Sequence, residues 1–385
     1  MTDVVITGIG VVSALGVGVE PFWRKLVAGE SGLRPIARFD AGGALGGEAP
    51  TLAPRDVVRT PIGRRIDRVS LLALAASRLA LADAGLDPAA LDPARTALGL
   101  GSAWGNLEET SGFLDRLFAR GTANPLVFPN LVMNASLSYA SIELGVTGPT
   151  AMLSSQEASG EAAVAWGAGV VAAGEADVCL AGGADELAEV LYRVLEEGGV
   201  LGRGRPRPFD PAADGPALGE GAAVLVLEPA SRARARGARA YARLVATPSF
   251  TVPAPVHGWP RDAAAIAAGL AAVVADADVV VAAASGRPDL DALEADALAR
   301  GPRAAVTTAR GAIGDFGAAG ALGVAVAALA LADGVVPPTV GLDAPPRAGL
   351  DVVVGTARAA RPRVVVVDGL ARGGVCRPLR LEAAA

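Results

Sequence analysis

Short runs rich in Val alternate along this chain with longer segments rich in Ala and Leu. Short apolar runs of this kind are typical of buried strands, and they predict strands over residues 177–183, 222–227, 277–283 and 364–367. Strands that alternate with helices indicate a layered α/β fold. The 385 residues are enough for one large core or for two similar halves.

We expect a boundary between two halves near residue 240, after an Arg-rich helix and its turn. This boundary divides the chain into residues 1–240 and residues 241–385. The longest apolar stretch, residues 318–332, is rich in Ala and Gly and is shorter than the roughly 20 residues that a membrane-spanning helix needs. It therefore predicts a buried helix, and we expect no contact with a membrane.

Composition narrows the class of protein further. The net charge of −6 and the pI near 5.1 give no reason to expect a nucleic-acid partner. Two cysteines, Cys179 and Cys376, are too few for a disulfide scaffold and suit a reducing cytoplasm. The first residues lead directly into a strand without a basic and apolar leader, so we expect a cytoplasmic protein without a signal peptide.

Residues 148–160 form the segment most informative about chemistry. An apolar run breaks at Ser154 and Ser155, and an Ala-rich helix is predicted from about Ala158. A strand, a tight turn and a helix start hold one side chain at a helix N-terminus, where free N–H groups and the helix dipole favour negative charge. Many acyl-transferring enzymes place a Cys at such an elbow because the dipole lowers the thiol pKa. Here the position carries Glu157, which cannot form a thioester.

This segment resembles the nucleophile region of the β-ketoacyl (acyl carrier protein) synthases, and further motifs follow in the order of that family. They are the opening strand and loop at 4–16, the signature at 207–210 and 218–222, the pair Asp291 and Glu294, the second His motif at 313–320, and the run at 337–339. The resemblance implies an α/β thiolase-like fold, with duplicated halves in a five-layer αβαβα sandwich.

The resemblance also shows where this chain departs from an active ketosynthase, which uses Cys, two His and a nearby Lys. By this resemblance, Glu157 occupies the position of the Cys and Ala283 that of the first His. Asp315 occupies the position of the second His, and Arg310 that of the Lys. Arg372 stands at the gating Phe of the family's glycine-rich segment.

These replacements remove the condensation chemistry. Ala283 has no donor to polarise a thioester carbonyl, and Asp315 is an acceptor at neutral pH, which is the wrong polarity for an oxyanion. Condensation by this chain alone is therefore not expected, nor is a cofactor or a metal. We hypothesise that Glu157 and Asp315 face one cavity, and that Arg310 forms a structural ion pair with Glu294.

Two kinds of inactive relative give an interpretation of the lost Cys. Chain-length factors of type II polyketide synthases pair with an active ketosynthase and shape the tunnel for the growing chain. Loading ketosynthases carry Gln in place of Cys, keep both His and decarboxylate malonyl groups. Chain-length factors also usually carry Gln at this position; a shift by one residue would place Gln156 there, but residues 158–160 fit better with Glu157 in that position.

The first interpretation is a non-condensing subunit that forms a heterodimer with a Cys-bearing ketosynthase and builds carrier-bound polyketide or polyene chains. A second is a malonyl decarboxylase, or another acyl-handling homologue, that uses Glu157 or Gln156. A third is a structural or regulatory homodimer. The loss of both His positions argues against decarboxylation.

The resemblance further implies which segments meet the partner subunit and the acyl carrier protein. A helix over 107–118 and the segment 124–129 would lie against the partner and line its tunnel. Helical spacing and register select Leu107, Thr110, Leu114 and Phe128, although ordinary amphipathic packing explains each equally well. Basic residues of a Gly/Pro loop, Arg203 and Arg205, could attract an acidic carrier or could simply be solvated.

Three remaining residues have simpler interpretations. Cys179 belongs to a predicted strand and is expected to be core packing. Cys376 lies in a Gly/Arg-rich loop and is a candidate reactive thiol, although no base is nearby in the sequence. His257, the only histidine, lies in a Pro-rich loop and is expected to be solvated.

Overall fold

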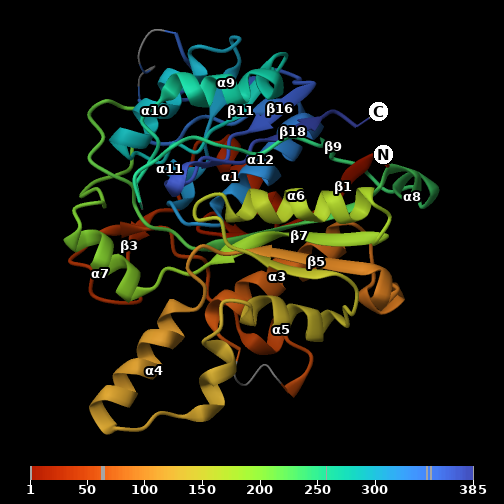
Figure 1. The fold of residues 1–385 in the computed structure, drawn as a ribbon, viewed down its shortest axis with the longest axis vertical. Coiled ribbons are helices and arrows are strands. Elements are labelled where there is room, and N and C mark those ends of the chain that lie inside the picture. Colours follow the sequence, from red (N-terminus) through yellow and green to blue (C-terminus); the bar gives the residue numbers. More distant parts are fainter. Residues whose placement is uncertain (1, 62–65, 257, 344–345, 347–348, 385) are drawn as a thin grey trace.

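The computed structural model describes residues 2–61, 66–256, 258–343, 346 and 349–384. Helices and sheets are stacked in five layers (Figure 1). The outer helices of the second half are α9 (Ala263–Val274) and α10 (Pro288–Leu298), and those of the first half are α3 (Arg68–Asp83) and α5 (Ala135–Leu144). The middle layer contains α6 (Ser159–Ala172) and α12 (Ala319–Asp333), with sheet on either side.

The strands of both halves join in one hydrogen-bonded order, β14-β12-β11-β16-β18-β9-β1-β8-β7-β5-β6. In the first half these strands are β1 (Val4–Ser13), β5 (Thr96–Gly101), β6 (Thr150–Leu153), β7 (Val178–Asp185) and β8 (Gly221–Pro229). In the second half they are β9 (Ala242–Val245), β11 (Val279–Val281), β12 (Ala305–Thr307), β14 (Asp351–Val352), β16 (Val364–Val367) and β18 (Leu379–Glu382). Strand β9 pairs with β1 on one side and with β18 on the other, so it connects the two halves.

Shorter elements surround this frame. Two-residue strands form small antiparallel pairs: β2 (Gly16–Val17) with β1, β3 (Arg34–Pro35) with β4 (Leu45–Gly46), β10 (Phe250–Thr251) with β17 (Val375–Cys376), and β13 (Val335–Val336) with β15 (Arg358–Ala359). The remaining α-helices are α1 (Val19–Val27), α2 (Pro54–Val57), α4 (Leu107–Arg120), α7 (Glu189–Glu197), α8 (Ala230–Ala235) and α11 (Arg310–Ile313). The 3₁₀ turns are η2 (Pro88–Ala90), η3 (Pro93–Arg95), η4 (Pro125–Asn130) and η5 (Arg372–Gly374).

The predicted strands and the predicted buried helix are confirmed. Strands β7, β8, β11 and β16 coincide with the four Val-rich runs, and every residue of β11 and β16 is buried. The apolar stretch 318–332 forms α12, which is buried continuously from Ala319 to Leu331 because sheet lies on both sides of it. In the described part of the chain, no helix is both long enough and apolar enough to cross a membrane.

The N-terminal ends of α6 and α12 approach each other closely, and this approach positions the candidate site. A Cβ atom on Gly160 would lie 2.5 Å from the backbone nitrogen of Ala321, and one on Gly320 would lie 1.9 Å from a carboxylate oxygen of Glu161. The first clash is with backbone, so position 160 requires glycine, whereas a side chain at position 320 would displace the carboxylate of Glu161. The elbow of the first half is thereby brought against the motif 313–320 of the second half.

Candidate functional site

The segment 148–160 folds as the predicted strand, turn and helix. Strand β6 ends at Leu153, and α6 begins at Ser159. Within the turn, the Ser159 hydroxyl accepts a hydrogen bond from the Ser155 N–H at 3.0 Å and donates one to the Gln156 carbonyl at 2.6 Å. Gln156 has a φ of 52°, a left-handed conformation that non-glycine residues adopt at a cost. The turn therefore places Glu157 at the sharp bend before the helix.

The Glu157 carboxylate is fully engaged by one arginine. It accepts hydrogen bonds from Nε of Arg372 at 2.7 Å and from the backbone N–H of the same residue at 3.1 Å. The guanidinium carbon of Arg372 also lies 5.2 Å from the centre of the Trp104 ring, within the range of a cation–π contact. The side chains of Glu157 and Arg372 are 14% and 19% exposed, so the ion pair is largely shielded from water.

A second ion pair joins Arg310 and Asp315 close to the first one. Arg310 is 6% exposed and donates from Nη1 to Asp315 Oδ1. The negative charges of Asp315, Glu161 and Glu157 all raise the pKa of Arg310, against the larger opposing effect of burial. Asp315 and Glu157 thus act on the same guanidinium. None of the described cavities is lined by both side chains, so the shared cavity stays a prediction.

The expected ion pair between Arg310 and Glu294 is wrong. Asp315 takes the guanidinium instead, because it lies five residues along the same turn and reaches Arg310 directly. Glu294 accepts a hydrogen bond from the backbone N–H of Ala283 at 2.7 Å. The Ala283 side chain is a methyl group within an apolar cluster, and its assignment to the position of the first His stays a prediction.

Buried carboxyl groups lie behind these ion pairs, and sequence reasoning missed two of them, Glu161 and Asp368. Burial raises the pKa of Glu161 to about 7, and neither of its carboxyl oxygens has a hydrogen-bond partner within the described residues. Burial also raises the pKa of Asp368 to about 7, and that of Glu294 well above its usual value. The charge of Asp368 is a further cause that raises the pKa of Glu294, and neither carboxyl oxygen of Asp368 has a hydrogen-bond partner within the described residues.

The degenerate residues gather at one edge of the sheets. Ala283 follows β11, Arg310 follows β12, and Glu157 follows β6, each just beyond the carboxyl end of a parallel strand. Such ends are where α/β sheets place their ligand sites. Asp185, at the end of β7, connects two further segments at this edge. Its carboxylate accepts a hydrogen bond from Ser102 Oγ, after β5, at 2.5 Å, and one from the backbone N–H of Ala318, before α12, at 2.6 Å.

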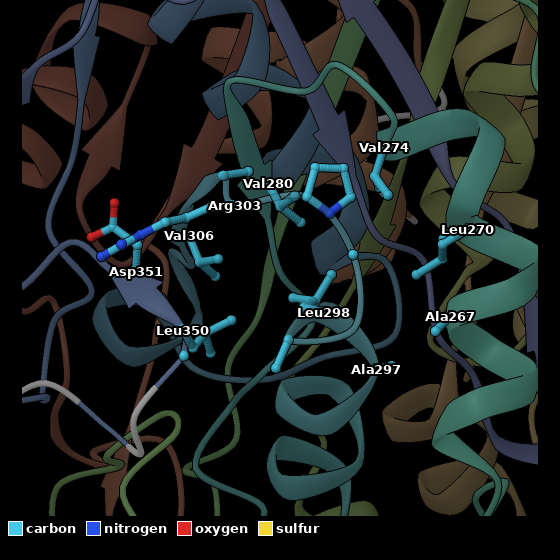
Figure 2. A pocket seen from close by; sticks show the side chains of 15 residues that line it. Ala267, Leu270, Val274, Val280, Ala297, Leu298, Arg303, Val306, Leu350 and Asp351 are labelled. Atoms are coloured by element: carbon cyan, nitrogen blue, oxygen red, sulfur yellow. The ribbon is translucent and has the colours of Figure 1, made fainter.

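A separate cavity of about 320 Å³ lies at the opposite ends of the second-half strands. Its wall is mainly apolar, with Leu298 and Leu350 directed inward and Arg303 and Asp351 at one end (Figure 2). Its described lining contains none of the residues predicted for the site. Across the described part of the chain, no group of three or more His, Cys, Asp and Glu side chains is arranged to hold a metal ion.

Helix α4 and turn η4 form an arm, residues 107–130, that projects from the body of the molecule (Figure 1). Its apolar side chains are unusually exposed: Leu114 40%, Phe118 81%, Leu126 53% and Phe128 59%. Along the arm, the ring of Phe128 contacts that of Phe113, with 6.4 Å between the centroids. The arm is therefore an apolar surface without a cover in the single chain.

The four predicted tunnel residues occupy two environments on this arm. Leu107 packs at the base against the small cluster that contains Leu191, and Thr110 is half-buried. Leu114 and Phe128 are exposed farther out. The four are thus on one arm, but they do not form one continuous buried wall within this chain.

The remaining candidates fall as follows. Arg203 and Arg205 are exposed, and neither forms an ion pair with a described residue. Cys179 is buried in β7, and Cys376 is buried too. Burial raises the pKa of each thiol to about 12, so the prediction of a reactive Cys376 is wrong. His257 lies outside the described residues.

Comparisons with known proteins agree with this geometry. Residues 1–233 match the model of the β-ketoacyl synthase N-terminal domain, and residues 249–343 match that of the C-terminal domain. The chain is 34% identical to the ketoacyl synthase alpha subunit of the tetracenomycin polyketide synthase of Streptomyces glaucescens, over 96% of this chain and 95% of the relative. It is also 34% identical to the beta subunit of the same synthase, over 96% of each chain.

A further curated relative is 3-oxoacyl-[acyl-carrier-protein] synthase 2 of Coxiella burnetii, which is 30% identical over 96% of each chain. Among solved structures, the ishigamide ketosynthase/chain length factor superposes with a TM-score of 0.91 at 29% identity, over the whole of both chains. The chain therefore has the thiolase-like ketosynthase fold and belongs to the β-ketoacyl synthase family.

Proposed function

We propose that this chain is a non-condensing subunit of the chain-length-factor type, which pairs with a Cys-bearing ketosynthase to extend a carrier-bound acyl chain. The observation that carries the proposal is a complete ketosynthase fold in which no group at the elbow can perform the condensation. The similarity to both the alpha and the beta subunit of one polyketide synthase, and to a ketosynthase/chain length factor structure, supports it.

The chemistry of the site supports the same proposal. Condensation needs a nucleophile that takes the acyl chain and donors that stabilise an oxyanion. The Glu157 carboxylate is occupied by Arg372, Ala283 offers only a methyl group, and Asp315 is paired with Arg310. On this proposal the nucleophile and both histidines come from the partner subunit.

The α4–η4 arm supplies a surface for that partner. Its exposed Leu and Phe side chains suit an apolar contact of the kind that forms the core of a stable subunit interface. The exposed guanidinium groups of Arg203 and Arg205 offer positive charge that an acidic carrier protein could approach.

Native mass after co-expression with a Cys-bearing ketosynthase from the same genome tests the proposal. We expect a stable one-to-one complex. Leu114→Asp together with Phe118→Asp should weaken that complex at least about tenfold, because desolvated apolar anchors dominate interface energies. Val256→Asp is the matched control, since Val256 is 87% exposed but lies in a loop of the second half.

A stable homodimer that forms no complex with the co-expressed ketosynthase would overturn the proposal. An equal loss of complex in the control variant would show that the arm has no special role. No observation in the site favours malonyl decarboxylation, which needs donors at the positions of Ala283 and Asp315.

A further inference from the structure

Arg372 joins three segments that are far apart in the sequence. It belongs to a short glycine-rich loop, residues 371–375, in the second half of the chain. Its side chain pairs with Glu157 at the elbow and lies over Trp104 in the segment between β5 and α4, both in the first half. One side chain therefore holds the loop against two segments of the other half.

The glycines of the loop are held by backbone hydrogen bonds to the second half. The Gly373 N–H donates to the Gly258 carbonyl at 2.9 Å, and the Val252 N–H donates to the Gly374 carbonyl at 2.9 Å. These are backbone contacts within the second half, so they do not depend on the side chain at position 372. Of the contacts described here, those of Arg372 are the ones that bring the loop onto the elbow.

The contact between Glu157 and Arg372 restrains both the backbone and the side chain of the loop residue. A single carboxylate receives both the side-chain Nε–H and the main-chain N–H of Arg372, which fixes the backbone of the loop as well as the side chain. Charge-assisted hydrogen bonds are about twice as strong as neutral ones, and here both partners are more than four-fifths shielded. The Trp104 ring adds a second attraction for the same cation.

We propose that Glu157 is a positioning residue that holds the glycine-rich loop closed over the elbow of this subunit. The carboxylate at the position of the nucleophile thus closes the site by binding the residue at the position of the gate. A consequence, which rests on the proposed function, is that a carrier-borne thioester is excluded from this elbow and is directed to the partner's cysteine.

Native thiols of the chain can report on this closure. Cys376 is fully buried directly after the loop, and its Sγ lies 3.8 Å from the Gly374 carbonyl oxygen. Cys179 is fully buried in the central strand β7, where it becomes reachable only if the first half unfolds. Alkylation of each cysteine, followed by peptide mass spectrometry, therefore distinguishes opening of the loop from unfolding of the molecule.

We expect Glu157→Ala and Arg372→Ala each to speed the alkylation of Cys376 on the order of tenfold, the factor that corresponds to about 1.4 kcal/mol. Cys179 should remain protected. In Glu157→Ala, hydrogen–deuterium exchange of residues 371–376 should rise in parallel, because the Arg372 N–H loses its acceptor. Arg193→Ala, which removes an exposed ion pair with Glu189, is the control and should change neither rate.

Unchanged alkylation of Cys376 in both Ala variants would overturn the proposal. If an Ala variant exposes both cysteines, Glu157→Gln is the deciding variant, since it keeps the size of the side chain and one acceptor. Faster alkylation of Cys376 alone would then support closure by the charge of Glu157, and unchanged alkylation would overturn the proposal. The measurement needs no partner, and if the chain is purified as a complex the peptides still identify each thiol. Its result is therefore independent of whether the heterodimer forms.

Discussion

On the proposed function, Glu157 and Ala283 stand in place of different parts of the condensation chemistry. Glu157 would replace a group that forms a thioester, and its carboxylate already accepts hydrogen bonds from two donors of Arg372. Ala283 would replace a hydrogen-bonding ring by a methyl group, and its backbone N–H donates to Glu294. Restoring one of the two groups leaves the other function missing.

We therefore predict that Glu157→Cys does not restore condensation. The new thiol would still lack donors for the oxyanion, and the loss of a single such donor already costs on the order of 100- to 1000-fold in rate. Mass spectrometry of the carrier-bound products, with the partner's cysteine replaced so that only the new thiol could act, is the measurement. Condensed product above the level of the unmodified chain would contradict the prediction.

Glu161 gives the folded protein a dependence on pH. Its pKa rises from 4.5 to about 7 on folding because of burial, so the folded state binds this proton more tightly than the unfolded state. The contribution to stability is complete below about pH 4.5 and is lost as the pH rises through 7, which corresponds to roughly 3 kcal/mol of unfolding free energy. Burial of Glu186, with a pKa of about 8, acts in the same direction.

Glu161→Gln should therefore be more stable than the unmodified chain at pH 8 and about equally stable at pH 5. Urea unfolding at the two pH values measures the difference. Glu189→Gln, which changes a half-exposed residue of a surface ion pair, is the control and should leave the pH dependence unaltered. An identical pH dependence in Glu161→Gln would show that the carboxyl stays ionised in the fold.

At the scale of elements, the predictable features are those with a local cause. The Val-rich runs gave strands β7, β8, β11 and β16, and the break at Ser154 and Ser155 gave the elbow, because buried strands and turns have their own residue preferences. The partner of Arg310 was not predictable in this way. It depends on how the turn at 310–315 folds back on itself, and no residue pattern states which of several nearby carboxylates lies closest.

The buried position of Cys376 has a similar explanation. A glycine- and arginine-rich segment is usually an exposed loop, but here β17 pairs with β10 and turns the thiol into the second-half core. The sequence contains a signal for Glu161, because it is a single carboxylate among the Ala, Gly and Val residues of the predicted Ala-rich helix. Its unpaired state depends on the packing of α12 against α6, which the sequence does not state.

The arm formed by α4 and η4 is the element through which a chain-length role would act. We predict that Thr110→Trp shortens the product of the reconstituted complex, because Thr110 is half-buried near the base and a larger ring would fill space there. Leu114→Ala should lengthen it, since it removes volume farther along the arm. Mass spectrometry of carrier-bound chains gives the product lengths.

The control for this pair is Arg120→Ala, at the exposed end of the same helix, which should leave the product length as it is. Unchanged products in both arm variants, from complexes that still form, would remove Thr110 and Leu114 from the set of tunnel residues. The prediction depends on the heterodimer and is therefore informative only after native mass has established the complex.

At the scale of the whole molecule, the layered sandwich of a thiolase-like fold was predictable from the order of the family motifs. The division into residues 1–240 and 241–385 stays a prediction. Strand β9 begins at Ala242, just beyond that boundary, and it pairs with strands of both halves. The buried carboxyls without partners and the contact between Glu157 and Arg372 were not predictable, because both depend on contacts between the halves.

The position of β9 limits how such a protein can be divided or rebuilt. If the chain were divided near residue 240, β9 would stay with β18 and lose its pairing with β1. The facing edges of β1 and β9 would then each present unpaired backbone groups, which favour aggregation. Neither fragment could be expected to behave as an independent module. Side chains at the strand ends can be exchanged without such a break, because the pairing of β9 with β1 and β18 is made by backbone groups.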